Sequence, residues 1–305
     1  MWSASPSEVI AARTRIDPVF LTTPLRRSSA LDRCFGAELL FKDETATPIR
    51  SFKGRGASNF IKQARETKGA VCASAGNFGQ GLAWACRERG VPLTVFSSCH
   101  AVPSKILAMV SLGAKVVLEG RDFDAAKEAA LSYATARDLL YVEDGAHAAI
   151  AEGAGTMALE ITEESGSFDC LIAPLGNGAL VAGLGAWMKH ISPDTQMIAV
   201  CAQGAPAMGS SVQQGKIITA AVADTIADGI AIRVPIPSAV FAVRAVTDEV
   251  GFVKDDDIRS AMALLNDELG VVVEPAGAAG MAALIADPSR WQGQKLAIPL
   301  CGGNC

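Results

Sequence analysis

The sequence predicts an α/β protein built from two doubly wound, parallel-sheet domains. Short apolar runs typical of buried strands alternate with longer helical stretches along most of the chain. Several of these runs end in a Gly-containing turn that opens the next helix, as strand-to-helix connections in parallel sheets do. The chain has 305 residues, of which 50% are hydrophobic and 19% charged, enough for one large or two moderate cores.

Strand and helix signals alternate along the chain. Strands are expected at 36–42, 70–74, 93–97, 115–118 and 140–142, and helices over 80–89, 103–112, 122–137 and from the Lys53 turn to about 68. Pro103 and Asp122 are helix-start signals. The alternation continues with helix 153–164, strand 170–174, helix 179–190, strand 197–201, a loop over 202–215, helix 255–269, a helix opening at 274 and strand 295–300.

Composition and charge exclude several classes of protein. The net charge of −5 and the isoelectric point near 5.3 leave no basic stripe for nucleic acid or anionic membranes. The N-terminus has no apolar signal region, and the uncharged run 170–188 is broken by Pro174 and Gly176, so we expect no membrane span. Eight cysteines without CxxC spacing and only three histidines favour free thiols in the cytoplasm and no metal site.

The stretch 50–57 contains the first candidate for chemistry. Lys53 is followed at once by Gly54, ahead of a helical run, which would present its amine in a cleft. A loop lysine is usually only a solvated cation. Here, three Gly-rich turns follow strands elsewhere in the chain, at 74–77, 175–179 and 301–304. A lysine together with several anion-binding turns is what a phosphorylated aldehyde cofactor requires.

Two of these turns have distinct expected ligands. In the turn formed by Gly176, Asn177, Gly178, Ala179 and Leu180, small residues let backbone N–H groups point at a phosphate, although any strand-to-helix connection favours glycine. The turn of Ser74, Ala75, Gly76 and Asn77 offers a hydroxyl, N–H donors and a carboxamide to a carboxylate; the alternative is an ordinary helix N-cap.

These motifs, taken in order, resemble those of the pyridoxal-phosphate enzymes of the serine/threonine dehydratase group, which share their fold with tryptophan synthase β subunits. The resemblance covers essentially the whole chain and rests on an ordered set of segments: 51–57, 74–77, 176–180, 227–229, 274–277 and 301–304. It implies a small domain of residues 52–145 set into a large domain of residues 1–51 and 146–305. The cofactor, pyridoxal 5′-phosphate, would lie in the cleft between them.

The resemblance also implies individual roles. Lys53 would hold the cofactor as an imine and, once released, act as the base at Cα. Phe52 would pack on the ring and Asn77 would hydrogen-bond the 3-hydroxyl oxygen, while the turn 176–180 would hold the phosphate. The turn 74–77 would bind the substrate carboxylate. Cys301 would lie beside the pyridine nitrogen, where a thiol is a weak partner, with Gly229 and Glu274 at the pocket wall.

Some positions depart from the family pattern. Phe78 stands where relatives commonly have His, and Asn177 and Ala179 interrupt the glycine run, so the effect of both changes on substrate and cofactor binding stays open. Racemases of the group have a second serine at the place of Ala75, so racemisation is disfavoured. The segment 202–206 has no carboxylate for the cation that many relatives bind, and because the chain stops at Cys305, just past the last motif, we expect no appended regulatory domain.

The reaction implied is β-elimination on a hydroxy amino acid, L-threonine or L-serine first, giving ammonia and a 2-oxo acid. One alternative is a β- or γ-replacement enzyme of the cysteine synthase or threonine synthase type. Another is a non-catalytic cofactor-binding protein. The partner is expected to be a small amino-acid substrate, and the protein a homodimer, the commonest enzyme assembly.

Overall fold

The computed structural model describes all 305 residues, and its strands form two sheets. The smaller sheet is parallel and has the order β5-β4-β3-β6. Its strands are β3 (Ala70–Ala73), β4 (Leu93–Ser97), β5 (Lys115–Leu118) and β6 (Leu140–Tyr141). Within this sheet β3 comes first in sequence, β4 and β5 are added on one side of it, and β6 is added on the other side. The sheet is therefore doubly wound, with its switch point between β3 and β6.

The larger sheet has the order β1-β2-β10-β7-β8-β9. Its strands are β1 (Leu25–Arg26), β2 (Glu38–Asp43), β7 (Cys170–Pro174), β8 (Gln196–Ala202), β9 (Glu249–Val253) and β10 (Lys295–Leu300). All neighbours are parallel except β1, which pairs antiparallel with β2 at the edge. The switch point lies between β7 and β10. Apart from the antiparallel strand β1, both sheets confirm the predicted fold class.

Helices surround both sheets. Those of the first half are α1 (Pro6–Ala12), α2 (Ser29–Phe35), α3 (Lys53–Gln63), α4 (Asn77–Arg89), α5 (Pro103–Ser111) and α6 (Phe123–Arg137). Those of the second half are α7 (Ala148–Ser165), α8 (Ala179–Ile191), α9 (Ala207–Gln214), α10 (Pro237–Arg244), α11 (Asp255–Leu269) and α12 (Pro275–Ala286). Short 3₁₀ turns lie at 18–20, 44–46, 228–230 and 288–291. No helix is both long and apolar enough to span a bilayer.

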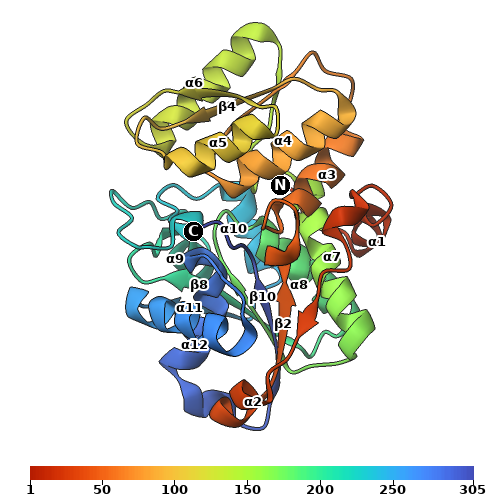
Figure 1. Ribbon diagram of the computed structural model, residues 1–305, viewed down its shortest axis with the longest axis vertical. Coiled ribbons are helices and arrows are strands. Elements are labelled where there is room, and N and C mark those ends of the chain that lie inside the picture. Colours follow the sequence, from red (N-terminus) through yellow and green to blue (C-terminus); the bar gives the residue numbers. More distant parts are fainter.

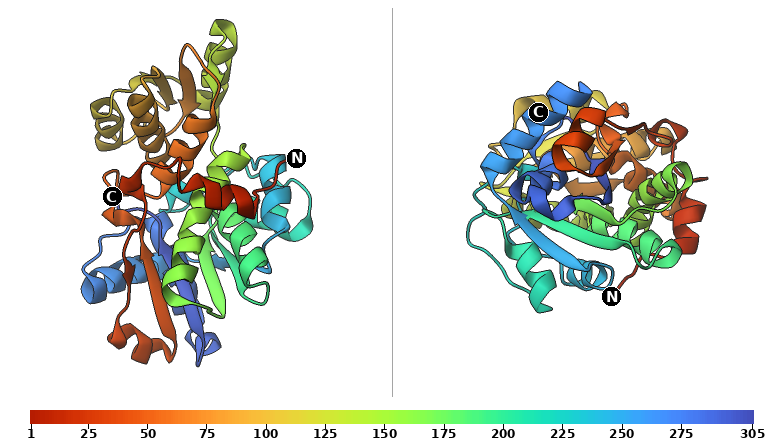
Figure 2. Two further views of the ribbon diagram at one scale, coloured as in Figure 1. Left: turned by 90° about the vertical axis from the view of Figure 1, so that its right-hand side faces the viewer. Right: turned by 90° about the horizontal axis from the view of Figure 1, so that it is seen from below.

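The molecule has two lobes, with α3 at their junction (Figure 1). The upper lobe in that view holds β4, α4, α5 and α6, and a side view shows the narrower waist and both chain ends near its level (Figure 2). The largest apolar core runs from the smaller sheet, at Cys72 and Val95, to the larger one, at Leu171 and Ala199. The domain limits 52–145 stay a prediction.

Most predicted strands lie within a residue or two of their observed positions, but a predicted loop and several predicted helix limits were wrong. The helix expected over 153–164, for example, begins at Ala148. The segment expected to be a loop over 202–215 contains α9, which packs Met208 and Val212 into the core and ends at Gly215 in the left-handed conformation. With only eight residues and two large apolar side chains, it is too short for periodicity to indicate a helix, so packing specifies it. The helix expected to continue to about residue 68 ends at Gln63.

Candidate active site

The predicted motifs meet at the carboxyl ends of the strands that flank the two switch points. The turn 74–77 follows β3, and Asp144 comes soon after β6, across the switch point of the smaller sheet. The turn 176–178 follows β7, and the segment 301–304 follows β10, across the switch point of the larger sheet. Because neighbouring connections diverge at a switch point, a crevice forms there, and this is where ligands bind in doubly wound folds.

Lys53 is the first residue of α3 and lies beside the end of β10. The backbone N–H of Phe52 donates to the carbonyl of Cys301 at 3.1 Å, and Ser51 forms an isolated antiparallel bridge with Gly302. The Lys53 Nζ lies 2.5 Å from the Asp144 Oδ2 and 4.6 Å from the centre of the Phe52 ring. Its side chain is 18% exposed, so the amine is held in the crevice between the lobes.

The turn after β7 leaves its backbone donors free. None of the N–H groups of Gly176, Asn177, Gly178, Ala179 and Leu180 donates a hydrogen bond within the protein, and no side chain caps α8. Gly178 has a φ of 94°, which favours glycine at this N-cap. Free N–H groups and the positive end of a thirteen-residue helix make this turn a ready acceptor for an anion.

The turn after β3 uses its serine internally. Ser74 Oγ accepts hydrogen bonds from the N–H of Gly79 at 2.8 Å and of Gly76 at 3.2 Å, so this hydroxyl shapes the turn. The N–H groups of Ala75, Asn77 and Phe78 have no protein acceptor and are the donors left for a carboxylate. Helix α4 starts at Asn77, three residues before the predicted start at Gln80. The first N–H groups of a helix have no acceptor within it, so those of Asn77 and Phe78 are free.

The Asn77 carboxamide is held from both ends. Its Nδ2 donates to the Glu274 Oε1 at 2.6 Å, and its Oδ1 accepts from the Asn304 Nδ2 at 2.8 Å. The second Nδ2 hydrogen is left for a ligand. Burial raises the pKa of the Glu274 carboxyl to about 7, and the nearby Asp228 carboxylate adds to this increase. Lys105 and the hydrogen bond from Asn77 act in the opposite direction.

Cys301 and Gly229 complete the crevice wall. Burial raises the pKa of the Cys301 thiol well above its ordinary value, so the group is neutral, and its Sγ donates to the Pro299 carbonyl. Gly229 lies against the β7 turn, because a Cβ at Gly176 would come within 2.8 Å of the Gly229 carbonyl oxygen. Beside it, Asp228 pairs with Lys105 of α5 at 2.5 Å.

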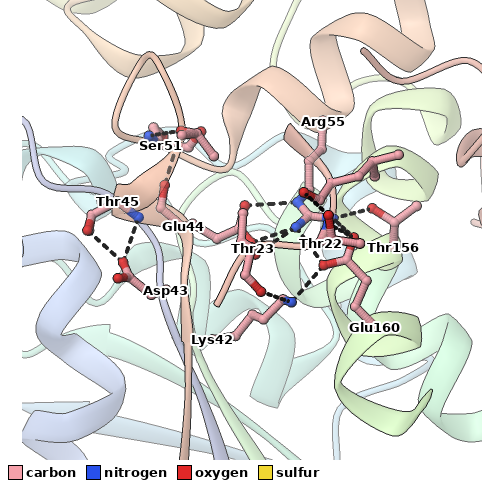
Figure 3. Close-up of polar contacts among 12 residues, drawn as sticks. Thr22, Thr23, Lys42, Asp43, Glu44, Thr45, Ser51, Arg55, Thr156 and Glu160 are labelled. Atoms are coloured by element: carbon pink, nitrogen blue, oxygen red, sulfur yellow. Dashed lines mark hydrogen bonds and ion pairs between the residues drawn. The ribbon is translucent and has the colours of Figure 1, made fainter. Parts of the chain in front are cut away.

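A buried charge cluster surrounds Arg55, which lies two residues after Lys53 on α3 (Figure 3). Arg55 is fully buried and donates to both oxygens of Glu44 and of Glu160, at 2.7 to 2.9 Å. Lys42 adds a second cation, 2.7 Å from Glu160. Burial opposes ionisation of Glu160, but the hydrogen bond and charge of Arg55 outweigh it and lower its pKa to about 2. The cluster is neutral overall and fixes the first turn of α3 against α7.

Sequence reasoning missed four residues that the structure places at or behind this site: Asp144, Asn304, Lys105 and Arg55. Arg55 and Asn304 lie inside the motif segments 51–57 and 301–304, but no role was predicted for either residue. The signal for Asp144 was its place just after a strand of a parallel sheet, next to Gly145. Lys105 gave no signal in the sequence, because only the fold brings α5 next to Asp228.

The residues present fit pyridoxal phosphate. The free N–H donors of the β7 turn suit its phosphate, the half-buried Lys53 amine suits its aldehyde, and the remaining N–H of Asn77 suits a ring oxygen. No group of three or more His, Cys, Asp or Glu side chains is arranged to hold a metal ion. Two open hollows lie at the amino-terminal end of the larger sheet, where Asp169 and Lys295 are among the lining residues. None of the predicted site residues lines either hollow.

Comparisons with known proteins agree with this fit. A family model described as pyridoxal-phosphate dependent enzyme matches residues 16–302. An L-threonine ammonia-lyase of Thermotoga maritima is 34% identical over 300 residues, which cover 97% of this chain and 75% of that protein. The crystal structure of a T.th. threonine deaminase superposes with a TM-score of 0.93 at 31% identity, covering 99% of this chain and 98% of the other.

A maize serine racemase superposes equally well, with a TM-score of 0.94 at 30% identity over 100% of this chain and 94% of the other. The match to the family model extends over nearly the whole chain, from before the first motif to Gly302. The family resemblance and the cofactor inferred from the motifs are thereby confirmed. This chain belongs to the family of pyridoxal-phosphate dependent enzymes.

Proposed function

We propose that the protein is a lyase that removes water and ammonia from a β-hydroxy amino acid, L-threonine or L-serine first, to give a 2-oxo acid. The observation that carries this proposal is the placement of the Lys53 amine between two turns with free backbone donors, one after β7 and one after β3. One turn suits the cofactor phosphate, the other the carboxylate of an amino acid. The ammonia-lyase from Thermotoga maritima is a relative with this activity in its name.

The chain's own residues divide the work. Bound pyridoxal phosphate supplies an electron sink for the charge that develops at Cα. The N–H groups of Ala75, Asn77 and Phe78 hold the substrate carboxylate, and the Lys53 amine removes the Cα proton. The Cys301 thiol is neutral and already donates to the Pro299 carbonyl, so it strengthens the sink only weakly. A weak sink suits departure of the β-hydroxyl better than a long-lived carbanion.

Ala75 supports elimination over racemisation. Racemisation needs a second group that returns a proton to the opposite face of Cα, and the alanine side chain has no group that can carry one. In the family, racemases place a serine there.

The Lys53→Ala variant tests the proposal. We expect it to lose both the visible absorbance of covalently bound cofactor and the release of ammonia from L-serine and L-threonine. A variant that keeps both would refute the role of Lys53. A panel of β-hydroxy amino acids, assayed for 2-oxo acid formation without a second substrate, separates elimination from replacement. Turnover that requires an added nucleophile or a phosphorylated substrate would favour a replacement enzyme, and bound cofactor without any turnover a non-catalytic protein.

We also infer that the enzyme acts in the cytoplasm as a homodimer, with no nucleic-acid or membrane partner. The net charge of −5 and eight free cysteines support a reducing compartment and the absence of a polyanionic partner. Dimers are the commonest assembly among enzymes. Sedimentation equilibrium measures the assembly directly, and a monomer would contradict this part of the proposal.

A further inference from the structure

Asp144 is an ionisable group at the crevice that the proposed roles do not use. It lies in the connection after β6, and Gly145 beside it holds that connection against the β7 turn. Gly145 has a φ of 86°, and a Cβ there would come within 2.3 Å of the Asn177 carbonyl oxygen. The backbone therefore fixes the Asp144 carboxylate between the smaller sheet and the candidate phosphate turn.

One oxygen of this carboxylate has a partner and the other has none. The Oδ2 lies 2.5 Å from Lys53 Nζ, whereas the Oδ1 is buried and makes no hydrogen bond. The side chain is only 12% exposed. A buried carboxylate oxygen without a donor is costly, so the site is incomplete without a ligand that supplies one.

No neighbouring cation can fill this place. Asp144 lines a cavity together with Lys127 and Arg233, but Lys127 pairs with Glu143, and Arg233 pairs with Asp124 and Asp122. Lys53 is thus the one cation paired with Asp144. If Lys53 held pyridoxal phosphate through its amine, the Asp144 carboxylate would be free to accept a hydrogen bond from another donor.

The geometry points to Asp144 as the residue that recognises the β-substituent of the substrate, by accepting a hydrogen bond from a hydroxyl or ammonium group on Cβ. This inference rests on the proposed function. A base acts within hydrogen-bond reach of the proton that it removes, so the Cα of the substrate must approach Lys53 Nζ. A substituent on the adjacent carbon then lies within reach of a carboxylate that touches the same nitrogen.

This recognition has consequences for substrate choice. A hydroxyl or an ammonium group can donate to the carboxylate, so β-hydroxy and β-amino acids fit. An O-phosphorylated side chain would place a second anion beside Asp144, and an O-acetyl group offers no donor. Such substrates, which replacement enzymes use, would be disfavoured by this residue alone.

Binding of a matched pair of unreactive ligands tests the inference. α-Methyl-L-serine and α-methylalanine have no Cα hydrogen to remove and differ by one hydroxyl group. Their dissociation constants are measured from the change in cofactor absorbance in the wild type, in Asp144→Asn and in Asp144→Ala. A hydrogen bond to a charged group is worth about 10- to 100-fold in affinity, so we expect the wild type to prefer α-methyl-L-serine by about that factor.

In Asp144→Ala this preference should fall to within about threefold, and in Asp144→Asn to an intermediate value, because an amide oxygen still accepts a hydrogen bond but has no charge. Retained cofactor absorbance in both variants shows that the site is folded. Glu143→Gln is the control, since Glu143 lines the same cavity but is paired with Lys127, and its preference should equal that of the wild type. An undiminished preference in Asp144→Ala would overturn the inference.

The two proposals can fail separately. If the wild type releases no ammonia from L-serine or L-threonine, the proposed reaction fails, but the ratio of the two dissociation constants still reports on Asp144. If the wild type turns over both amino acids yet binds the two unreactive ligands equally, the recognition role fails and the proposed reaction stands.

Discussion

The Asn77 carboxamide can present only one orientation to a ligand, because its two neighbours determine which end donates. The Asn304 Nδ2 is a donor, so the atom facing it at 2.8 Å must be the Asn77 carbonyl oxygen. The Asn77 Nδ2 then faces the Glu274 carboxylate at 2.6 Å. An ionised Glu274 can only accept a hydrogen bond from Asn77, so the other N–H of Asn77 is directed at the site. A protonated Glu274 could donate a hydrogen bond instead, and the carboxamide would then no longer be limited to one orientation.

Glu274 should make the stability of the cofactor-free protein depend on pH. Its pKa rises from 4.5 to about 7 on folding, chiefly because of burial. Between these values the folded protein holds a proton that the unfolded chain has lost, so the free energy of unfolding should fall as the pH rises through this window. The effect is at most about 3 kcal/mol. We expect Glu274→Gln to lack this decrease when denaturant unfolding is followed from about pH 4.5 to pH 7.

The control for this measurement is Glu268→Gln, because Glu268 is an exposed carboxylate on α11. Its pH profile should coincide with that of the wild type. Parallel profiles for the wild type and Glu274→Gln would mean that Glu274 ionises in the folded protein as it does in the unfolded chain.

At the scale of elements, the sequence was informative where apolar runs end in glycine-rich turns. Strands 93–97, 115–118, 170–174 and 295–300 have their predicted limits because each is a predominantly apolar run between turn signals. The turns that follow β3, β7 and β10 were predictable for the same reason. The partners Asp144 and Lys105 were not, because their approach to Lys53 and Asp228 depends on strand order. Helices α9 and α10 and strand β9 were missed because elements of five to eight residues are too short to show a clear periodicity.

The contact between α3 and α4 should be sensitive to a single methyl group. A Cβ at Gly81 would lie 2.8 Å from both the carbonyl carbon and oxygen of Lys53, so the two helices could not keep their spacing. We expect Gly81→Ala to destabilise the protein by about 1–3 kcal/mol, as overpacking does, and to weaken cofactor binding by shifting Lys53. Thermal melting and titration with pyridoxal phosphate measure the two effects.

Gly251→Ala provides the matched comparison, because a Cβ at Gly251 in β9 meets no atom within 4 Å. This variant should melt and bind cofactor as the wild type does. Equal behaviour of Gly81→Ala and Gly251→Ala would show that α4 can move without disturbing Lys53.

At the scale of the whole molecule, the Arg55 cluster ties together segments that are distant in sequence. Arg55 on α3 bonds Glu44 after β2 and Glu160 on α7, and all three side chains are buried (Figure 3). Removing the guanidinium leaves two carboxylates with only Lys42 to balance them. We expect Arg55→Met to lower the free energy of unfolding by about 3–5 kcal/mol. The exposed Arg259→Met variant is the control, and a comparable loss in both would contradict a special role for the cluster.

Three ion pairs join the segment 228–234 to the smaller lobe. Lys105 of α5 lies 2.5 Å from Asp228, and Arg233 pairs with Asp122 and Asp124 at the start of α6. Asp122 is also the N-cap of α6, where it accepts a hydrogen bond from the N–H of Ala125. Arg233, Asp122 and Asp124 are partly exposed, so their interaction is weak and is screened by salt.

The attachment of α6 to the segment 228–234 should therefore loosen as ionic strength rises. We expect amide hydrogen exchange at the start of α6 to increase between about 0.01 M and about 1 M salt in the wild type, because the Debye length falls from about 30 Å to about 3 Å. In Arg233→Gln exchange should already be fast at low salt and change little. Amides of the buried helix α7 serve as the internal control and should not respond. A salt response in Arg233→Gln equal to that of the wild type would show that other contacts hold the lobes together.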